Sequence, residues 1–141
     1  LPACRELGVA VTAYGVLSRG LISGHFTTPA GGARDFRTYS PRFQGDNLAA
    51  NLQLAEALRA VAAPLGLTPA QAAIAWVLSR GEDIIPLVGA RRVGRLAEAL
   101  GALEATLSQN DLAAIEAAVP AGAVAGDRYA AAQMAHLDSE Q

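Results

Sequence analysis

Two short apolar runs bounded by glycine predict strands in this sequence. The first covers residues 8–14, Gly-Val-Ala-Val-Thr-Ala-Tyr, and ends at Gly15. The second covers residues 84–88, Ile-Ile-Pro-Leu-Val, and precedes Gly89. Both runs are short and rich in β-branched residues, a pattern typical of strands buried on both faces, although Pro86 is unusual inside a strand.

Apolar residues at three- and four-residue intervals predict helices in the rest of the chain. One begins at Asp46 or Asn47 and ends before Pro64. Thr68-Pro69-Ala70-Gln71 has the residues of a capping box and opens a helix that runs to Leu78. Two more helices follow, one from the turn 89–92 and one from Ser108 to Val119.

Two further segments lack a sustained period. Residues 15–45 read as a long loop, which in a compact domain is usually functional or disordered. Residues 121–141 form a C-terminal tail with a short helix near 130–137. Before the first strand, residues 4–7 resemble a last helical turn that stops at Gly8.

The order of these elements predicts a parallel βαβ arrangement, because helices separate the two strands. A parallel sheet of two strands leaves both edges open, whereas such strands occur almost only in larger, covered sheets. The first residue is Leu1 rather than methionine. We therefore expect residues 1–141 to be one partial domain, a piece of a larger α/β fold.

The composition of the chain excludes several kinds of chemistry and of binding partner. The 141 residues are 52% hydrophobic, and all eleven basic residues are arginine, so lysine chemistry within the chain is excluded. A net charge of −2 argues against a nucleic-acid partner. No run approaches the roughly 18 to 20 apolar residues of a membrane span. Cys4 stands alone, which predicts a reducing, cytoplasmic setting and gives no pair of metal ligands.

The first candidate site follows the first strand, at residues 14–20. Ligands of parallel folds meet the carboxyl ends of strands, where small residues let backbone N–H groups approach an anion. Tyr14 would offer an aromatic face for a planar ring. The alternative is an ordinary loop with an interfacial tyrosine.

The second candidate covers residues 89–98, where a glycine at a strand end precedes a helix start. Free N–H groups and arginines at such a place can hold a phosphate. If the helix begins near Arg91, then Arg91, Arg95 and Glu98 lie on one face. The alternative is a solvated basic face on which Arg95 pairs with Glu98, although arginines oppose the dipole at a helix start.

Other residues give weaker signals. His25 and His136 have no ligand-spaced partners and are interpreted as solvated loop residues. Trp76 is expected in the core. Three arginines of the long loop either form a lid onto a cofactor phosphate or are solvated charges: Arg34, Arg37 and Arg42.

Together these segments resemble aldo/keto reductases. Residues 13–24, Ala-Tyr-Gly-Val-Leu-Ser-Arg-Gly-Leu-Ile-Ser-Gly, are similar to the family's seventh strand and the loop after it. Residues 68–78 are similar to the helix before the eighth strand, and residues 84–98 to that strand, Pro86 included, and the cofactor helix after it. The resemblance covers nearly the whole chain and implies the C-terminal part of a TIM-type (β/α)8 barrel, with two parallel strands and several helices.

The resemblance also implies an NADP(H) site. It assigns Tyr14 to stacking on the nicotinamide. It assigns Gly89 and Arg91 to the 2′-phosphate, and Arg95 and Glu98 to the adenosine. The loop along the ribose and pyrophosphate would be formed by Gly15, Val16, Leu17, Ser18 and Arg19.

This sequence departs from the family pattern at several places. Gly15-Val16 stands where many members have Ser-Pro, His25 where many have lysine, and Ala99 where an adenine-binding asparagine is frequent. The family's catalytic Asp, Tyr, Lys and His belong to earlier strands. No residue of this chain therefore receives a catalytic role, and none is expected to bind a metal.

Two functions follow as hypotheses. In the first, the chain is the cofactor-binding half of an NADP-dependent reductase that, when intact, reduces aldehydes or ketones as small-molecule substrates. In the second, it is a non-catalytic NADP(H)-binding or regulatory module that self-associates through its open sheet edges. A helix-rich structural fragment is a third reading, which the two anion motifs disfavour.

Overall fold

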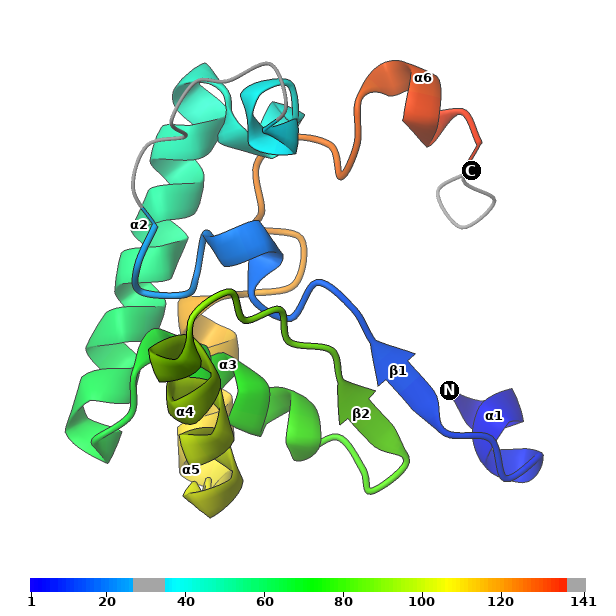
Figure 1. Cartoon of the computed structure of the whole chain (residues 1–141), viewed down its shortest axis with the longest axis vertical. Helices are drawn as coiled ribbons and strands as arrows, with labels where there is room; N and C mark the ends of the chain where they lie inside the picture. Colours follow the sequence, from blue (N-terminus) through cyan, green and yellow to red (C-terminus); the bar gives the residue numbers. More distant parts are fainter. Residues whose placement is uncertain (27–34, 137–141) are drawn as a thin grey trace.

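The computed structural model describes residues 1–26 and 35–136. Its elements alternate as the sequence predicts, and the fold is of the α/β class with two parallel strands and several helices (Figure 1). The strands are β1 (Val11–Ala13) and β2 (Ile84–Pro86). The helices are α1 (Pro2–Glu6), α2 (Gly45–Ala62), α3 (Pro69–Leu78), α4 (Val93–Leu100), α5 (Gln109–Ala118) and α6 (Ala131–Met134).

The two strands pair in parallel, with Val11 opposite Ile84 and Ala13 opposite Pro86. The N–H of Leu87 donates to the carbonyl of Ala13 at 2.9 Å. Since Leu87 rather than Pro86 supplies this donor, the strand tolerates a residue without an N–H. Both arrowheads in Figure 1 point toward the same loops, so the carboxyl ends of the strands meet on one side of the molecule.

The prediction that both strands are buried on both faces is wrong for this chain. Helix α3 contacts β2 and buries Ile84, but Thr12 and Ile85 on the alternate positions are exposed. Side chains of a strand point alternately to opposite faces, and the described elements cover only one of them. The strands are also shorter than the apolar runs that predict them, three residues each.

The core lies where α2, α3 and α5 meet. Its buried cluster is rich in alanine, which lets the helices approach closely: Leu58, Ala62, Ala72, Ala73 and Ile115. Trp76 packs against this cluster while remaining partly exposed. The predicted capping box is confirmed, because the N–H of Gln71 donates to Thr68 Oγ1 at 3.2 Å and the N–H of Thr68 to Gln71 Oε1 at 2.9 Å.

The start of α2 differs from the prediction. The helix begins at Gly45, with Gln44 as its N-cap, rather than at a cap formed by Asp46 or Asn47. The Asn47 side chain donates instead to the carbonyl of Pro41 at 3.1 Å. The Asn47 side chain is therefore bonded to the preceding turn and does not cap the helix.

The described residues of the long loop, 15–26 and 35–45, form short helical turns that its composition does not predict. Three 3-10 turns lie in this described part of the loop, η1 (Ser18–Gly20), η2 (Phe36–Thr38) and η3 (Pro41–Phe43). Two more follow α2 and α4, η4 (Ala63–Leu65) and η5 (Gly101–Glu104). Arg34 lies outside the described residues. The tail helix expected near 130–137 is α6, and residue 137 also lies outside the described part.

Helix α4 turns its apolar positions outward. The predicted apolar positions are exposed at Val93, Leu96, Leu100 and, just after the helix, Leu103, and Val93 is the most accessible at 85%.

Within residues 1–26 and 35–136, no single helix is long and apolar enough to cross a bilayer. The helical segments 45–65 and 69–78 would together have the length and apolar composition of a span, but the chain bends by 83° between them.

Candidate functional site

The carboxyl ends of β1 and β2 open onto a cavity of about 1100 Å³. All ten residues that the sequence analysis assigns to a cofactor line it: Tyr14, Gly15, Val16, Leu17, Ser18, Arg19, Gly89, Arg91, Arg95 and Glu98. The lining also includes side chains that the sequence analysis left out or read as weak: His25, Phe26, Arg37, Arg42, Arg92 and Arg128. Two segments more than sixty residues apart in the sequence thus form one site.

One wall of the cavity is the turn after β1. Gly15 has a φ of +75°, a conformation that glycine adopts without strain. Ser18 and Arg19 have φ values of +48° and +54°, in a region that residues with side chains seldom occupy. Consecutive strained residues cluster at functional sites, and here they place Arg19 in the cavity wall.

Aromatic rings surround Arg19. Its Cζ lies 4.4 Å from the ring centroid of Phe36 and 5.2 Å from that of Tyr129. The hydroxyl groups of Tyr14 and Tyr129 share a hydrogen bond. This hydrogen bond, and secondarily the Arg19 guanidinium, hold the pKa of Tyr129 below its usual range. The end of β1 therefore carries a fixed cation beside exposed aromatic surface.

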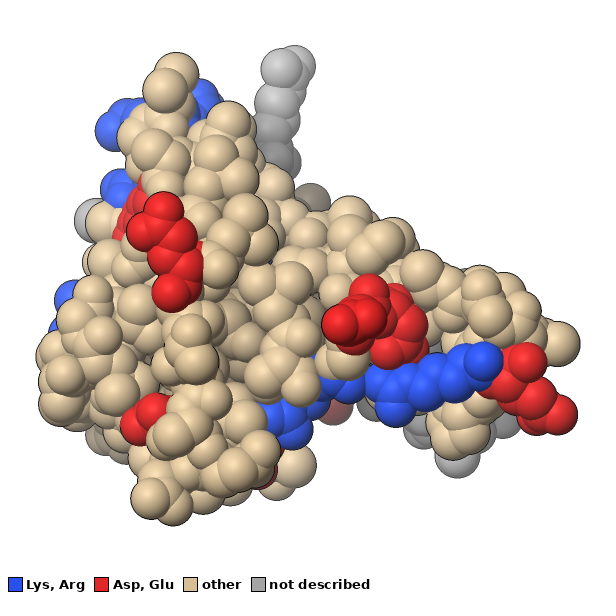
Figure 2. Space-filling view, turned by 90° about the horizontal axis from the view of Figure 1, so that it is seen from below, with Lys and Arg blue, Asp and Glu red and all other residues tan. Residues whose placement is uncertain are grey.

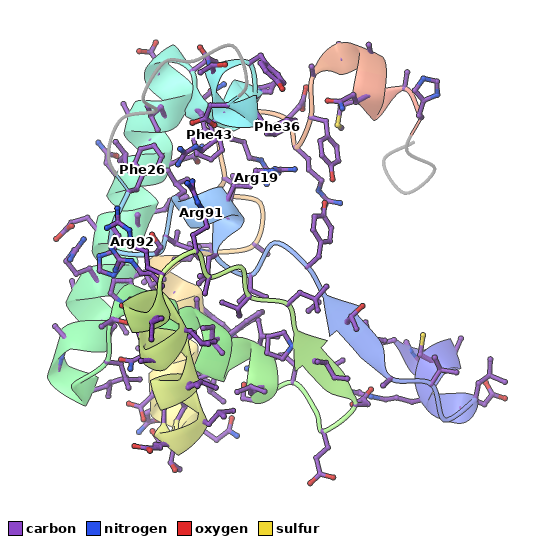
Figure 3. The ribbon with its side chains drawn as sticks, in the orientation of Figure 1. Arg19, Phe26, Phe36, Phe43, Arg91 and Arg92 are labelled. Atoms are coloured by element: carbon purple, nitrogen blue, oxygen red, sulfur yellow. The ribbon has the colours of Figure 1, made fainter. Side chains whose placement is uncertain are left out.

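The second wall is the loop that leads into α4. Arg92 is the N-cap and the helix begins at Val93, so Arg91 precedes the helix. The prediction that Arg91, Arg95 and Glu98 share one helix face is wrong for Arg91, because extended backbone at Arg92 delays the helix. Arg91 and Arg92 nevertheless lie on the side of α4 where Arg19 and Phe26 are found (Figure 3), and all four line the cavity.

A small ion-pair cluster closes this end of the cavity. Arg95 Nη1 lies 3.2 Å from Glu98 Oε2, the pairing that the sequence analysis kept as an alternative. His25 is an exposed loop residue, as predicted, but its Nε2 lies 2.8 Å from the same oxygen and it pairs with Glu98. Burial raises the pKa of Glu98, but hydrogen bonds from His25, Thr68 and Arg95 outweigh it and the net pKa is lowered.

The charges at the cavity are mainly positive. Arg37 pairs with Asp35, with Nη2 and Oδ2 2.7 Å apart. Within residues 1–26 and 35–136, Arg91 and Arg92 have no ion-pair partner. The face seen in Figure 2 shows acidic and basic side chains mixed over a largely uncharged surface. A net charge of −2 thus coexists with a local concentration of arginine.

One residue of the tail lines the cavity and its neighbour contacts two lining residues; neither was among the candidates predicted from the sequence. Arg128 lines the cavity, and Tyr129 contacts both Arg19 and Tyr14. They are more than 100 residues from the β1 turn, and no periodicity or spacing links them to it. The pattern Asp-Arg-Tyr at 127–129, charged and aromatic residues in an otherwise alanine-rich tail, is the only local indication.

The arrangement can hold a ligand with phosphate groups and a planar ring. Arginines bind phosphate with paired donors, and the first N–H groups of α4, which have no partners within the helix, lie beside Arg91 and Arg92. Tyr14, 59% exposed, offers a ring face. Among the residues that the structure describes, no group of three His, Cys, Asp or Glu side chains is placed to hold a metal ion.

Comparison with known proteins places this site in a family context. Residues 1–120 match the model of the aldo/keto reductase family. The chain is 40% identical over 129 residues to probable aldo-keto reductase 1 of Glycine max, and the match covers 92% of this chain and 37% of that protein. It is 36% identical over 130 residues to aldo-keto reductase yakc [NADP(+)] of Schizosaccharomyces pombe, covering 92% and 38%.

A solved structure shows the same likeness. The glycerol dehydrogenase AKR11B4 from Gluconobacter oxydans superposes with a TM-score of 0.73 at 28% identity, over 84% of this chain and 36% of that one. The chain spans about two fifths of the length of the curated relatives that it matches, the shares being 37%, 38% and, for aldo-keto reductase str7 of Strobilurus tenacellus, 42%.

Proposed function

The chain belongs to the aldo/keto reductase family, and from this premise we propose that it is the cofactor-binding, C-terminal part of an NADP-dependent oxidoreductase. The intact barrel would reduce aldehydes or ketones. When bound, NADPH supplies the hydride for such a reaction. The residues of this chain bind and orient the cofactor. The lone Cys4 fits a reducing compartment, so we place the protein in the cytoplasm.

The cavity supports an assignment of the two ends of the cofactor. Tyr14 and Arg19, at the end of β1, would meet the nicotinamide and the pyrophosphate. Arg91, before α4, would meet the 2′-phosphate that distinguishes NADP(H) from NAD(H). The printed name of the S. pombe relative includes NADP(+), which agrees with this choice.

One observation carries the proposal: Arg91 lines the cavity beside the start of α4 and has no ion-pair partner in the part of the chain described. A cation without an internal partner loses no existing contact when it meets a phosphate. Arg95, by contrast, is already held by Glu98 at 3.2 Å. Among the described residues, Arg91 and its neighbour Arg92 are therefore the arginines most available to a ligand phosphate, and the family resemblance selects Arg91.

The test is titration of the purified protein and its Arg91→Ala variant with NADPH and with NADH. We expect the variant to lose about ten- to a hundredfold in NADPH affinity, the effect of a charged hydrogen bond, and to keep its NADH affinity. Arg59→Ala is the matched control, because Arg59 pairs with Glu56 on the exposed side of α2 away from this cavity. Equal losses for both nucleotides would contradict the 2′-phosphate role.

The second candidate function is a non-catalytic NADP(H)-binding module that associates with copies of itself. The outward-facing apolar residues of α4 and the exposed Ile85 and Leu87 of the β2 segment favour it, since such surface usually marks an interface. Carbonyl-dependent oxidation of NADPH by a complete barrel that contains these residues supports the first function. Nucleotide binding by a stable oligomer without turnover supports the second.

A further inference from the structure

Asn51 is a buried polar residue, and the formation of α2 does not by itself require a polar side chain at this position. It lies on α2 with 1% of its surface exposed, on a helix whose other buried residues are apolar. Its Nδ2 donates to the carbonyls of Arg42 at 3.0 Å and of Ala125 at 2.9 Å. Its Oδ1 accepts the N–H of Ala125 at 2.9 Å. One side chain thus satisfies both backbone groups of a residue 74 positions away.

The neighbouring residues add a second attachment. Arg42 Nε donates to the carbonyl of Gly126 at 3.2 Å. Gly126 has a φ of +83° and packs so tightly that a Cβ there would lie 2.8 Å from Asn47 Nδ2. The chain at 125–126 is therefore held against the corner between η3 and α2 by hydrogen bonds and by close packing.

This attachment brings Tyr129 against two residues that line the cavity, Arg19 and Tyr14. Three residues after Gly126, the Tyr129 ring lies 5.2 Å from Arg19 Cζ and 6.4 Å from the Phe36 ring, and its hydroxyl bonds to that of Tyr14. Arg19 and Tyr14 are the residues proposed for the pyrophosphate and nicotinamide. A guanidinium already fixed over aromatic rings loses less freedom when it binds a phosphate.

We propose that Asn51 is a positioning residue for the cofactor site: by holding Ala125 it places Tyr129 against Arg19 and Tyr14, and so preorganises the nicotinamide end of the cavity. Asn51 does not line the cavity. The inference rests on the proposed function, because it concerns one half of the NADP(H) site. The proposal gives residues 125–129 of the C-terminal tail a role in organising that site.

The experiment compares two probes, NADPH and adenosine 2′-monophosphate, which lacks both the pyrophosphate and the nicotinamide half. In Tyr129→Ala, we expect NADPH to bind about three- to tenfold more weakly, as loss of a cation–π contact implies, with binding of the monophosphate unchanged. Tyr129→Phe keeps the ring and loses only the hydroxyl, so it should recover most of the NADPH affinity.

Asn51→Asp tests the positioning itself. The aspartate retains an acceptor for the N–H of Ala125 but turns an oxygen toward the carbonyls of Arg42 and Ala125, which repels them. We expect the same selective loss of NADPH affinity as in Tyr129→Ala. Tyr129 is partly exposed, so its variants keep the test valid if Asn51→Asp fails to fold.

The outcomes separate the two proposals. If the unmodified protein binds neither probe, the proposed function fails and this inference with it. If the unmodified protein binds both, but Tyr129→Ala binds NADPH normally or loses both probes equally, the inference alone is overturned. A selective loss of NADPH supports it, since a general weakening of the fold would affect both probes.

Discussion

Two glycines in the segment after α5 have nearly the same φ angle but different surroundings. Gly122 and Gly126 have φ values of +81° and +83°. A Cβ on Gly122 would meet nothing within 4 Å, whereas one on Gly126 would lie 3.0 Å from the carbonyl oxygen of Pro41. The pair therefore separates the cost of the conformation from the cost of the contact.

We expect Gly126→Ala to lower the free energy of unfolding by about 1–3 kcal/mol more than Gly122→Ala, because only the first forces atoms together. Urea unfolding of both variants measures this difference. Equal losses would mean that the segment at 126 moves away from η3 without cost, and would weaken the case that it is firmly held.

Residue-level reasoning from the sequence found the cavity lining but not what supports it. The glycines and arginines at the strand ends indicate an anion site by type and position, and all ten predicted residues line the cavity. Asn51 reads as one polar residue among several on α2, and His25 as isolated. Their partners, Ala125 and Glu98, are 74 and 73 residues away, beyond the reach of local patterns.

Among the helices, α5 offers a test of local capping that is independent of the site. Ser108 Oγ accepts the N–H of Asp111 at 3.2 Å, and the N–H of Ser108 donates to Asp111 Oδ2 at 2.8 Å. Neither residue lines the cavity. The hydrogen bonds from Ser108 also hold the pKa of Asp111 below its usual range.

Replacing Ser108 by alanine should cost about 1 kcal/mol of stability, the usual value of an N-cap, and should leave NADPH affinity unchanged. The Ser108→Thr variant keeps the hydroxyl, so its stability should stay close to that of the original protein. Thermal or urea unfolding together with nucleotide titration checks both statements. Weakened nucleotide binding in the alanine variant would contradict the separation of α5 from the site.

At the level of elements, the sequence identifies those whose signals are local. The capping residues of α3 and α5 act within four positions, and both helices begin where predicted. The start of α2 and the burial of the strands were mispredicted, because each depends on contacts with residues outside the element itself. Asn47 bonds to Pro41 rather than capping the helix, and the face of the sheet bearing Ile85 has no cover among the described elements.

Across the whole molecule, the largest apolar residues are divided between a core and an uncovered surface. The outer face of α4 and η5 exposes Leu100 at 54% and Leu103 at 67%. An exposed row of this kind is typical of a surface that contacts other protein. It fits both the remainder of a barrel and a second copy of the chain.

If the 141 residues alone associate in solution, this row is the expected contact. Changing Leu100 and Leu103 together to glutamate should then shift sedimentation toward the monomer, since burying the new charges is costly. Ala113→Glu, on the exposed side of α5, is the control and should sediment like the original chain. An oligomer that persists in the double variant would assign the contact to the sheet edges instead.

The bond between Tyr14 and Tyr129 spans 115 residues, and a ribosome adds Tyr14 near the start of this segment and Tyr129 near its end. During synthesis, the strands, the arginines before α4 and the helical core all emerge before the segment that Asn51 holds. Contacts so far apart in sequence form late, after the local elements. The site therefore gains Tyr129 last, and a nascent chain that stops short of Ala125 would carry Arg19 and Tyr14 without the tyrosine that packs against them.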